Sequence, residues 1–287
     1  MSNKERFKDK VVVVTGASSG IGKATALAFA HESAKTVLIS RSKGKLESVA
    51  DEIRGFNENV LVVPTDVSSK DEVDMMVEKV VSKFDRIDVL FNNAGSSYVG
   101  PISNESFVED TKEMLEVDFM GTVYTTKAIL PVMKKQGSGY IMNMSSVVGR
   151  KAFPHFGGCS LAMHAITAFT DSLRQELRGS GIGVSTIYPP LTQTPLLEHV
   201  KPEDMPPPVK GITPITVDSV AKAVLDGVYY NRARVIVPFQ PKLLLLADAI
   251  SPSLGHLVVR LLAKKAFSRV LGMYRGNLYQ HGNAYID

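Results

Sequence analysis

The chain has 287 residues, of which 44% are hydrophobic, and its 33 basic and 29 acidic side chains leave a net charge of +4. This composition excludes a disordered, collagen-like or disulfide-stapled protein, and the small charge excess does not predict a nucleic-acid binder. The single cysteine, Cys159, excludes an internal disulfide and a multi-cysteine metal site. The polar N-terminus predicts no secretory signal, no apolar run approaches the ~20 residues of a membrane span, and we expect a cytoplasmic location.

Short runs rich in branched residues alternate with longer segments of helical period. Most of the short runs are continuously apolar, which is typical of strands buried on both faces. The predicted strands are Val11–Thr15, Thr36–Ser40, Val60–Pro64, Val89–Asn92, Tyr140–Asn143, Val184–Tyr188 and Val235–Val237. The predicted helices lie near Gly20–His31, Lys43–Gly55, Lys70–Phe84, Thr111–Met133, Cys159–Gly179 and Val217–Tyr230. This alternation predicts an α/β fold with one doubly wound parallel sheet.

Two regions depart from the alternation. The segment Pro189–Gly211 is rich in proline and has little apolar period, so we expect a long loop of the kind that is often functional. From residue 241 the chain continues beyond the last predicted strand. We therefore expect one domain over residues 1–240 and a basic amphipathic extension over residues 241–287.

A glycine-rich segment follows the first predicted strand and opens the first predicted helix. It reads Thr15-Gly16-Ala17-Ser18-Ser19-Gly20-Ile21-Gly22, with the spacing G-x-x-x-G-x-G. Glycines here let a pyrophosphate approach backbone N–H groups at the positive end of a helix. The alternative is a turn that ends a strand for steric reasons, but the position between an apolar strand and an apolar helix favours dinucleotide binding.

Three motifs in sequence order resemble the short-chain dehydrogenase/reductase (SDR) family. They are the glycine-rich segment, Asp66-Val67 after the third predicted strand, and Asn92-Asn93-Ala94-Gly95 after the fourth. The resemblance covers roughly residues 8–240 and implies a Rossmann-type SDR fold in a single domain with a C-terminal helical extension. It implies that the cofactor is bound by Gly16, Ser18, Ser19, Gly20, Ile21, Gly22, Asp66, Val67, Asn92, Ala94, Gly95 and Thr194.

Arg41 directly follows the second predicted strand. In the resembling family, members that prefer NAD usually carry an acidic residue here, on the ribose hydroxyls. A guanidinium suits a 2′-phosphate by its charge and by its bidentate geometry. The alternative is an ordinary solvated arginine, and we expect NADP(H) as the cofactor.

The proton-relay positions of the family differ in this chain. By the resemblance, Ser146 matches the serine that binds the carbonyl, whereas Cys159 stands at the acid/base tyrosine and Met163 at the lysine. Asp118 stands at the asparagine that anchors a water chain, and Pro189-Pro190 replaces the Pro-Gly beside the nicotinamide. A positioned acid/base contributes roughly 10²–10⁴-fold to a rate. The sequence therefore predicts slow carbonyl reduction.

Few side chains are candidates to replace the missing tyrosine and lysine. Cys159 is a candidate acid, but its short side chain and the lack of a nearby cation favour a buried thiol that packs as a hydrophobe. His155 lies four residues earlier and faces the same cleft if the helix starts early; the alternative is a loop histidine. Asp118 is a candidate base, although a carboxylate beside the carbonyl opposes alkoxide formation. We expect Met163 to fill the vacated ammonium space.

Three functional hypotheses stay open on the sequence. The first is an SDR-type NADP(H)-binding oxidoreductase, with a degenerate relay and a small carbonyl or alcohol substrate. The second is an inactive cofactor-sensing or partner-binding protein, and the third is a non-redox enzyme that uses the SDR cavity. The helices near Thr111–Met133 and Cys159–Gly179 resemble the pair that joins SDR subunits, which predicts a homodimer or homotetramer.

The C-terminal extension carries an uneven charge. No acidic residue occurs between Asp248 and Asp287, whereas cations lie among apolar residues that recur at helical spacing over 254–275. A basic amphipathic helix of this kind can lie on a membrane surface. The alternative is that its apolar stripe packs on the domain or on a second subunit.

Overall fold

The computed structural model describes residues 5–198, 200, 204–206, 209, 212–237 and 240–262. Within them, one sheet has the strand order β3-β2-β1-β4-β5-β6-β7, and every neighbouring pair is parallel. The strands are β1 (Val11–Thr15), β2 (Lys35–Ser40), β3 (Val60–Pro64), β4 (Val89–Asn92), β5 (Gly139–Met144), β6 (Ile182–Tyr188) and β7 (Arg234–Ile236). The order reverses at β1, so the predicted doubly wound sheet is confirmed.

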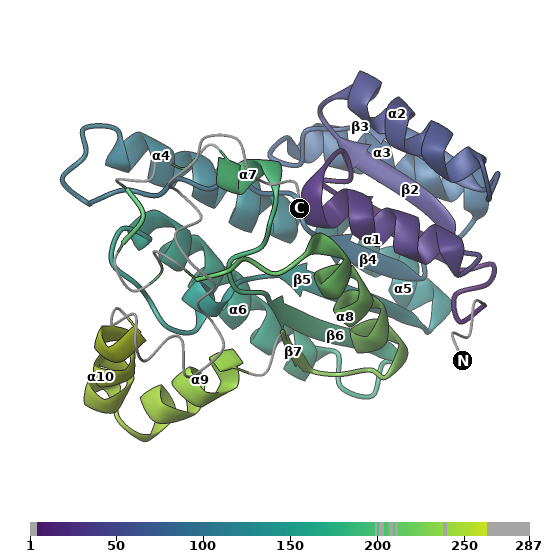
Figure 1. Cartoon of the computed structure of the whole chain (residues 1–287). Coiled ribbons are helices and arrows are strands. Elements are labelled where there is room, and N and C mark those ends of the chain that lie inside the picture. The colour runs from purple at the N-terminus through teal and green to yellow at the C-terminus, as the bar shows by residue number, and fades with distance from the viewer. Residues whose placement is uncertain are drawn as a thin grey trace.

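Helices cover both faces of this sheet, as Figure 1 shows from the side of α1 and α8. One face carries α1 (Gly20–His31), α2 (Lys43–Arg54) and α8 (Val217–Tyr229), and the other carries α3 (Lys70–Phe84), α5 (Gly121–Gln136) and α6 (Gly157–Glu176). In β1, Val12 and Val14 pack in the first core and Val11 and Val13 in the second. Successive side chains of a strand point to opposite faces, so the four consecutive valines of β1 are buried on both faces of the sheet.

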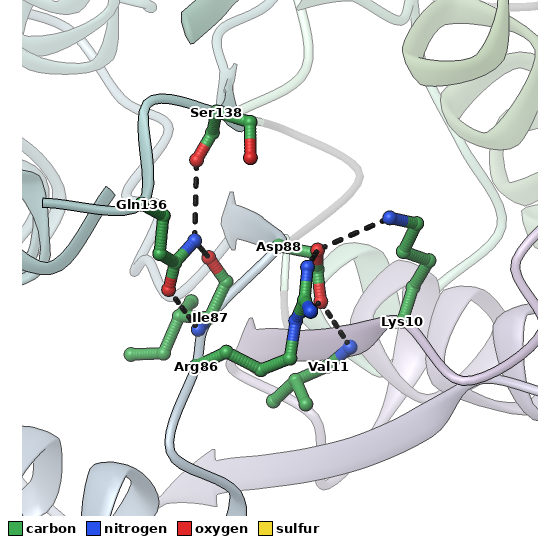
Figure 2. A network of polar contacts seen from close by, with 7 residues as sticks. All are labelled: Lys10, Val11, Arg86, Ile87, Asp88, Gln136 and Ser138. Atoms are coloured by element: carbon green, nitrogen blue, oxygen red, sulfur yellow. Dashed lines mark hydrogen bonds and ion pairs between the residues drawn. The ribbon is translucent and has the colours of Figure 1, made fainter. Parts of the chain in front are cut away.

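Two polar clusters join the amino ends of the central strands (Figure 2). The buried carboxylate of Asp88 accepts hydrogen bonds from the Val11 backbone N–H at 2.9 Å and from the Arg86 guanidinium at 2.6 and 2.9 Å. Burial alone raises its pKa, but the hydrogen bonds from Arg86 and Val11 hold the pKa of Asp88 below its usual value. Nearby, the Gln136 side chain accepts from the Ile87 N–H and donates to the Ile87 carbonyl, each at 2.9 Å. These bonds fix the strands at their amino ends, opposite the carboxyl ends from which the glycine-rich segment and the segment Asn92–Gly95 emerge.

A third apolar cluster lies apart from the two cores and gathers residues from the loops and helices that follow the strands. It includes Met114, Phe156, Cys159, Met163 and Ile166. The helix predicted near Thr111–Met133 is interrupted: α4 (Phe107–Met114) continues through a π-helical segment η1 (Leu115–Met120) into α5. A short 3₁₀ helix, η2 (Val147–Gly149), follows β5, and α7 (Pro195–Glu198) lies within the predicted long loop.

The extension begins with two helices, α9 (Gln240–Ile250) and α10 (Pro252–Leu262), which form a V at the edge of the molecule in Figure 1. They contain the first part of the predicted amphipathic stretch over 254–275. The remainder of that stretch, residues 263–275, lies outside the described residues. Among the helices of the described part, none has the length and apolar character needed to cross a membrane.

Candidate functional site

The glycine-rich segment forms a tight turn between β1 and α1. Gly16 has φ +65° and Gly20 has φ +53°, a region that side chains other than glycine rarely adopt. A β-carbon on Gly22 would lie 2.1 Å from the Gly16 carbonyl oxygen, so the turn can close only around glycine. Ser19 at the N-cap makes no side-chain hydrogen bond, and the first turn of α1 holds no acidic residue. The N-terminus of α1 therefore presents free backbone N–H groups and the positive end of the helix dipole to an anion.

The motif after β4 is bonded directly to this turn. The Thr15 hydroxyl accepts hydrogen bonds from the backbone N–H of Asn93 at 2.8 Å and of Ala94 at 2.9 Å, and the Asn93 amide donates to the Thr15 carbonyl at 3.0 Å. A β-carbon on Gly20 would lie 3.2 Å from the Thr194 methyl carbon. The fold thus brings three segments that are far apart in sequence to one end of the sheet.

The remaining cofactor candidates lie at the ends of β2 and β3. Arg41 is exposed directly after β2 and forms no ion pair within the described part of the chain. The preceding Ser40 hydroxyl is buried without a hydrogen-bond partner. The carboxylate of Asp66 accepts from the N–H and the hydroxyl of Ser68 at 3.0 and 2.7 Å, and Val67 packs on Gly121 at the start of α5. A free cation and an unpaired hydroxyl suit an anionic ligand at this edge.

Asn92 belongs to a buried polar chain that the sequence analysis did not recognise. Its side chain accepts from the Thr125 hydroxyl at 2.7 Å and donates to Asn143 at 2.9 Å, and Asn143 donates to the Thr170 hydroxyl at 2.9 Å. These bonds join α5, β4, β5 and α6 across the centre of the sheet. Asn92 is therefore a positioning residue. The asparagines at the ends of two neighbouring predicted strands, Asn92 and Asn143, were the sequence signal that could have revealed this hydrogen-bonded network.

Ser146 lies at the carboxyl end of β5 and caps η2. Its hydroxyl donates to the Pro189 carbonyl at 3.2 Å, and that carbonyl also accepts from the Val147 N–H at 3.1 Å. A serine hydroxyl has a single proton to donate. Ser146 must therefore leave Pro189 before it can bind a substrate carbonyl.

Asp118 lies in the π-helical segment with 2% of its surface exposed. One carboxyl oxygen, Oδ1, accepts from the Ser96 N–H at 2.7 Å, and the other, Oδ2, is buried without a partner. Burial raises the pKa of Asp118 to about 8, although the hydrogen bonds from Ser96 oppose the rise. At pH 7 this raised pKa favours the neutral acid over the carboxylate that a base would require.

Cys159 and Met163 lie one turn apart on α6, and both are buried in the third apolar cluster. Burial raises the pKa of the Cys159 thiol to about 12, and the charge of Asp118 adds to the rise. The thiol therefore stays protonated, as the expected packing role requires. The Met163 side chain is also enclosed: a β-carbon on Gly149 would lie 2.8 Å from the Met163 β-carbon.

His155 does not share the helical face of Cys159. Helix α6 begins at Gly157, and His155 precedes it with φ +65°. The Nδ1 atom of its ring lies 2.6 Å from the Asp204 carbonyl oxygen, which joins the two loops. The early helix start on which a relay role depended is absent, so the loop interpretation fits its position.

A groove of about 1260 Å³ runs between α1 and α8, and Ser146 is not among the residues that line it. Of the glycine turn it touches Gly20, beside Pro195 of α7, and its lining also includes Arg6 and Tyr230. No group of three or more histidine, cysteine, aspartate or glutamate side chains among the described residues has metal-site geometry. The candidate site is therefore the edge where the strands end, not this groove.

Comparison with known proteins agrees with this architecture. An uncharacterized oxidoreductase of Staphylococcus saprophyticus is 37% identical over 226 residues, which cover 76% of this chain and 89% of that protein. An uncharacterized oxidoreductase of Staphylococcus aureus is 36% identical over 220 residues, which cover 76% of this chain and 90% of the relative.

Solved structures give the same result. Levodione reductase superposes with a TM-score of 0.75 at 28% identity, covering 82% of this chain and 99% of that one. A 3-ketoacyl-(acyl-carrier-protein) reductase from Brucella melitensis complexed with NADH gives 0.73 at 27% identity, with coverages of 80% and 97%. An alcohol dehydrogenase from Thermococcus sibiricus complexed with 5-hydroxy-NADP gives 0.70 at 28% identity, with coverages of 80% and 96%. The sequence model described as short chain dehydrogenase matches residues 10–204, and the chain therefore belongs to this oxidoreductase family.

Proposed function

We propose that the protein is an NADP(H)-dependent oxidoreductase that reduces an apolar carbonyl compound slowly. The observation that carries the cofactor assignment is the uncapped, acid-free N-terminus of α1 behind the turn of Gly16 and Gly20. The Brucella reductase holds NADH and the Thermococcus dehydrogenase holds 5-hydroxy-NADP, so the fold accommodates both classes of dinucleotide. Such a cofactor supplies the hydride when bound.

Arg41 supports the choice of the phosphorylated cofactor. It is exposed at the end of β2, and no acidic side chain of the described residues pairs with it. The N–H groups of the α1 turn would hold the pyrophosphate, and the Arg41 guanidinium would hold a 2′-phosphate through two parallel hydrogen bonds. The family resemblance adds Asp66 at the adenine and Thr194 at the carboxamide.

The substrate side supports an apolar carbonyl compound and a slow reaction. The third apolar cluster, with Phe156 and Met163, supplies apolar side chains beside the candidate relay residues. Reduction adds a hydride to the carbonyl carbon and a proton to its oxygen, and by the family resemblance Ser146 would bind that oxygen after releasing the Pro189 carbonyl. Neither Cys159, a thiol that keeps its proton, nor Met163 reproduces an acid beside a cation.

A second candidate, a protein that binds the cofactor without turnover, rests on the same two side chains. Cys159 and Met163 make this part of the site apolar, whereas the glycine turn keeps the geometry of an anion site. Both candidates require cofactor binding. Only the oxidoreductase requires NADPH consumption that depends on a carbonyl compound, so a panel of ketones and aldehydes separates them.

The cofactor assignment is tested by calorimetric titration with NADPH and NADH. We expect the wild type to bind NADPH at least ten-fold more tightly than NADH, and Arg41→Asp to abolish the difference. Lys35→Asp, which changes the same charge at the opposite end of β2, is the matched control and should keep the preference. Equal affinities in the wild type would refute the assignment.

The relay assignment is tested by rebuilding the missing pair. We expect Cys159→Tyr with Met163→Lys to raise the rate of carbonyl reduction at least ten-fold. Cys159→Phe with Met163→Lys has nearly the same bulk without the hydroxyl and should not, while NADPH binding reports folding of both. A wild type that already turns over at ~1–10³ s⁻¹, the ordinary enzyme range, would refute slow reduction.

A further inference from the structure

The outer faces of α9 and α10 expose an unusual concentration of apolar side chains. On α9, Leu246 is 60% exposed and Ile250 is 72% exposed; on α10, Leu254 and Leu257 are 39% and 45% exposed. These four are among thirteen exposed large apolar side chains in the described part of the chain. Single exposed apolar residues are normal, but a cluster within twelve residues indicates an interaction surface.

This exposure is not the result of loose packing between the two helices. Their inner faces bury Leu244 and Val259, and Gly255 packs so closely on Asp248 that a β-carbon would lie 2.1 Å from its Oδ1 atom. The spacings of the exposed residues, four on α9 and three on α10, place each pair on one side of its helix. The pair of helices is therefore apolar inside and apolar outside.

The one acidic side chain among the described residues of α9 and α10 is paired. Asp248 is the sole acidic residue between 240 and 286, and its carboxylate forms an ion pair of 2.6 Å with the buried Lys151. Arg260 is exposed at the end of α10, and the sequence continues with Lys264 and Lys265. An exposed apolar face that carries the exposed cation Arg260 and is followed in the sequence by two lysines complements an anionic lipid surface.

We propose that α9 and α10 form a docking surface for an anionic membrane, with Leu246, Ile250, Leu254 and Leu257 entering the interface. The helices have 11 residues each, so they lie on the bilayer and do not cross it. The Lys151–Asp248 pair fastens this surface to the loop that follows Ser146, because the Lys151 N–H donates to the Val147 carbonyl at 3.0 Å. Docking would therefore hold the Ser146 loop against the inner side of the helix pair, with α9 and α10 between the loop and the membrane.

The test is co-sedimentation of the full chain with phosphatidylcholine vesicles that contain or lack phosphatidylserine. Without cofactor or substrate, we expect binding to the phosphatidylserine vesicles at low salt, and at least ten-fold weaker binding to pure phosphatidylcholine or at high salt. The variant Leu246→Ser with Ile250→Ser should bind at least ten-fold more weakly than wild type. Met75→Ser on α3, with the same 60% exposure as Leu246, is the matched control and should bind as wild type does.

Two results would overturn the proposal. One is that the wild type does not sediment with phosphatidylserine vesicles. If light scattering then shows a wild-type dimer that the double serine variant dissociates, the apolar face binds a second copy of the chain and not a membrane. The other is that the double serine variant binds the vesicles as tightly as wild type. NADPH binding is measured separately on the same variants. Loss of vesicle binding with NADPH binding intact concerns only the docking surface, and loss of NADPH binding concerns only the proposed cofactor.

Discussion

Replacing Asp118 by asparagine should stabilise the protein at alkaline pH and leave it unchanged in acid. Asparagine has nearly the shape of the neutral carboxylic acid but cannot ionise. The folded-state pKa of Asp118 is raised by burial from 3.8 to about 8, so between these values the folded protein holds a proton that the unfolded chain has lost. The free energy of unfolding of the wild type must then fall as pH rises through this window.

The size of the effect follows from the same two values. At ~1.36 kcal/mol per pH unit, a rise from 3.8 to about 8 corresponds to on the order of 6 kcal/mol. The difference between Asp118→Asn and wild type should therefore be near zero at pH 4, grow steadily to pH 8, and remain constant above it. The second carboxyl oxygen, which is buried without a partner, accounts for the cost of ionisation.

Urea unfolding at half-unit steps from pH 4 to 9 measures this difference. Asp51→Asn, at an exposed aspartate of α2, is the matched control and should follow the wild type at every pH. An infrared carboxylic-acid band that is present at pH 7 and absent from Asp118→Asn would report the proton directly. A stability difference that does not depend on pH, or a loss of stability at pH 8, would refute the neutral buried acid.

Three further outcomes follow from the geometry. In urea unfolding, Gly16→Ala should lower the free energy of unfolding by roughly 1–3 kcal/mol more than Gly137→Ala. Both glycines have φ near +65°, but only at Gly16 would the added carbon meet the Asn93 amide, at 2.8 Å. Equal losses would contradict this close approach. Asp88→Asn should lower the free energy of unfolding by about 1–3 kcal/mol at pH 7. The difference should shrink as pH falls through the lowered folded-state pKa of Asp88, because the wild type then loses the same stabilisation. A difference that stays constant in acid would contradict the ion pairs. Native Cys159 should react with iodoacetamide at pH 8 at least a hundred-fold more slowly than the urea-unfolded chain, since the burial that raises its pKa also hinders access; comparable rates would contradict a buried thiol.

Self-association stays a prediction from the family resemblance. We expect a dimer or tetramer by light scattering at micromolar concentration, with the segments α4–α5 and α6 between subunits. Leu161, 52% exposed on α6, is an apolar side chain that such an interface would cover. Leu161→Glu should lower the mass, whereas Met75→Ser should not, and a monomeric wild type would remove the prediction.

The sheet and the glycine turn could be predicted because their causes are local. A strand buried on both faces is mostly apolar, as the four valines of Val11–Thr15 are, and glycine at position 16 permits the positive φ that a tight turn needs. The predicted strands consequently agree with the structure to within two residues at either end. The order of the motifs then identified the family, since each one follows a strand of the same parallel sheet.

Properties that depend on burial had to come from the tertiary structure. Nothing near Asp118 in the sequence shows that its carboxyl lies 2% exposed with one oxygen unpartnered, and only this desolvation makes it a neutral acid. Likewise, the apolar spacing of Leu254 and Leu257 fits a buried stripe as well as an exposed one. Which side of a helix meets the core is decided by contacts between segments distant in the chain, here the pairing of Lys151 with Asp248, and an amphipathic pattern alone does not contain that information.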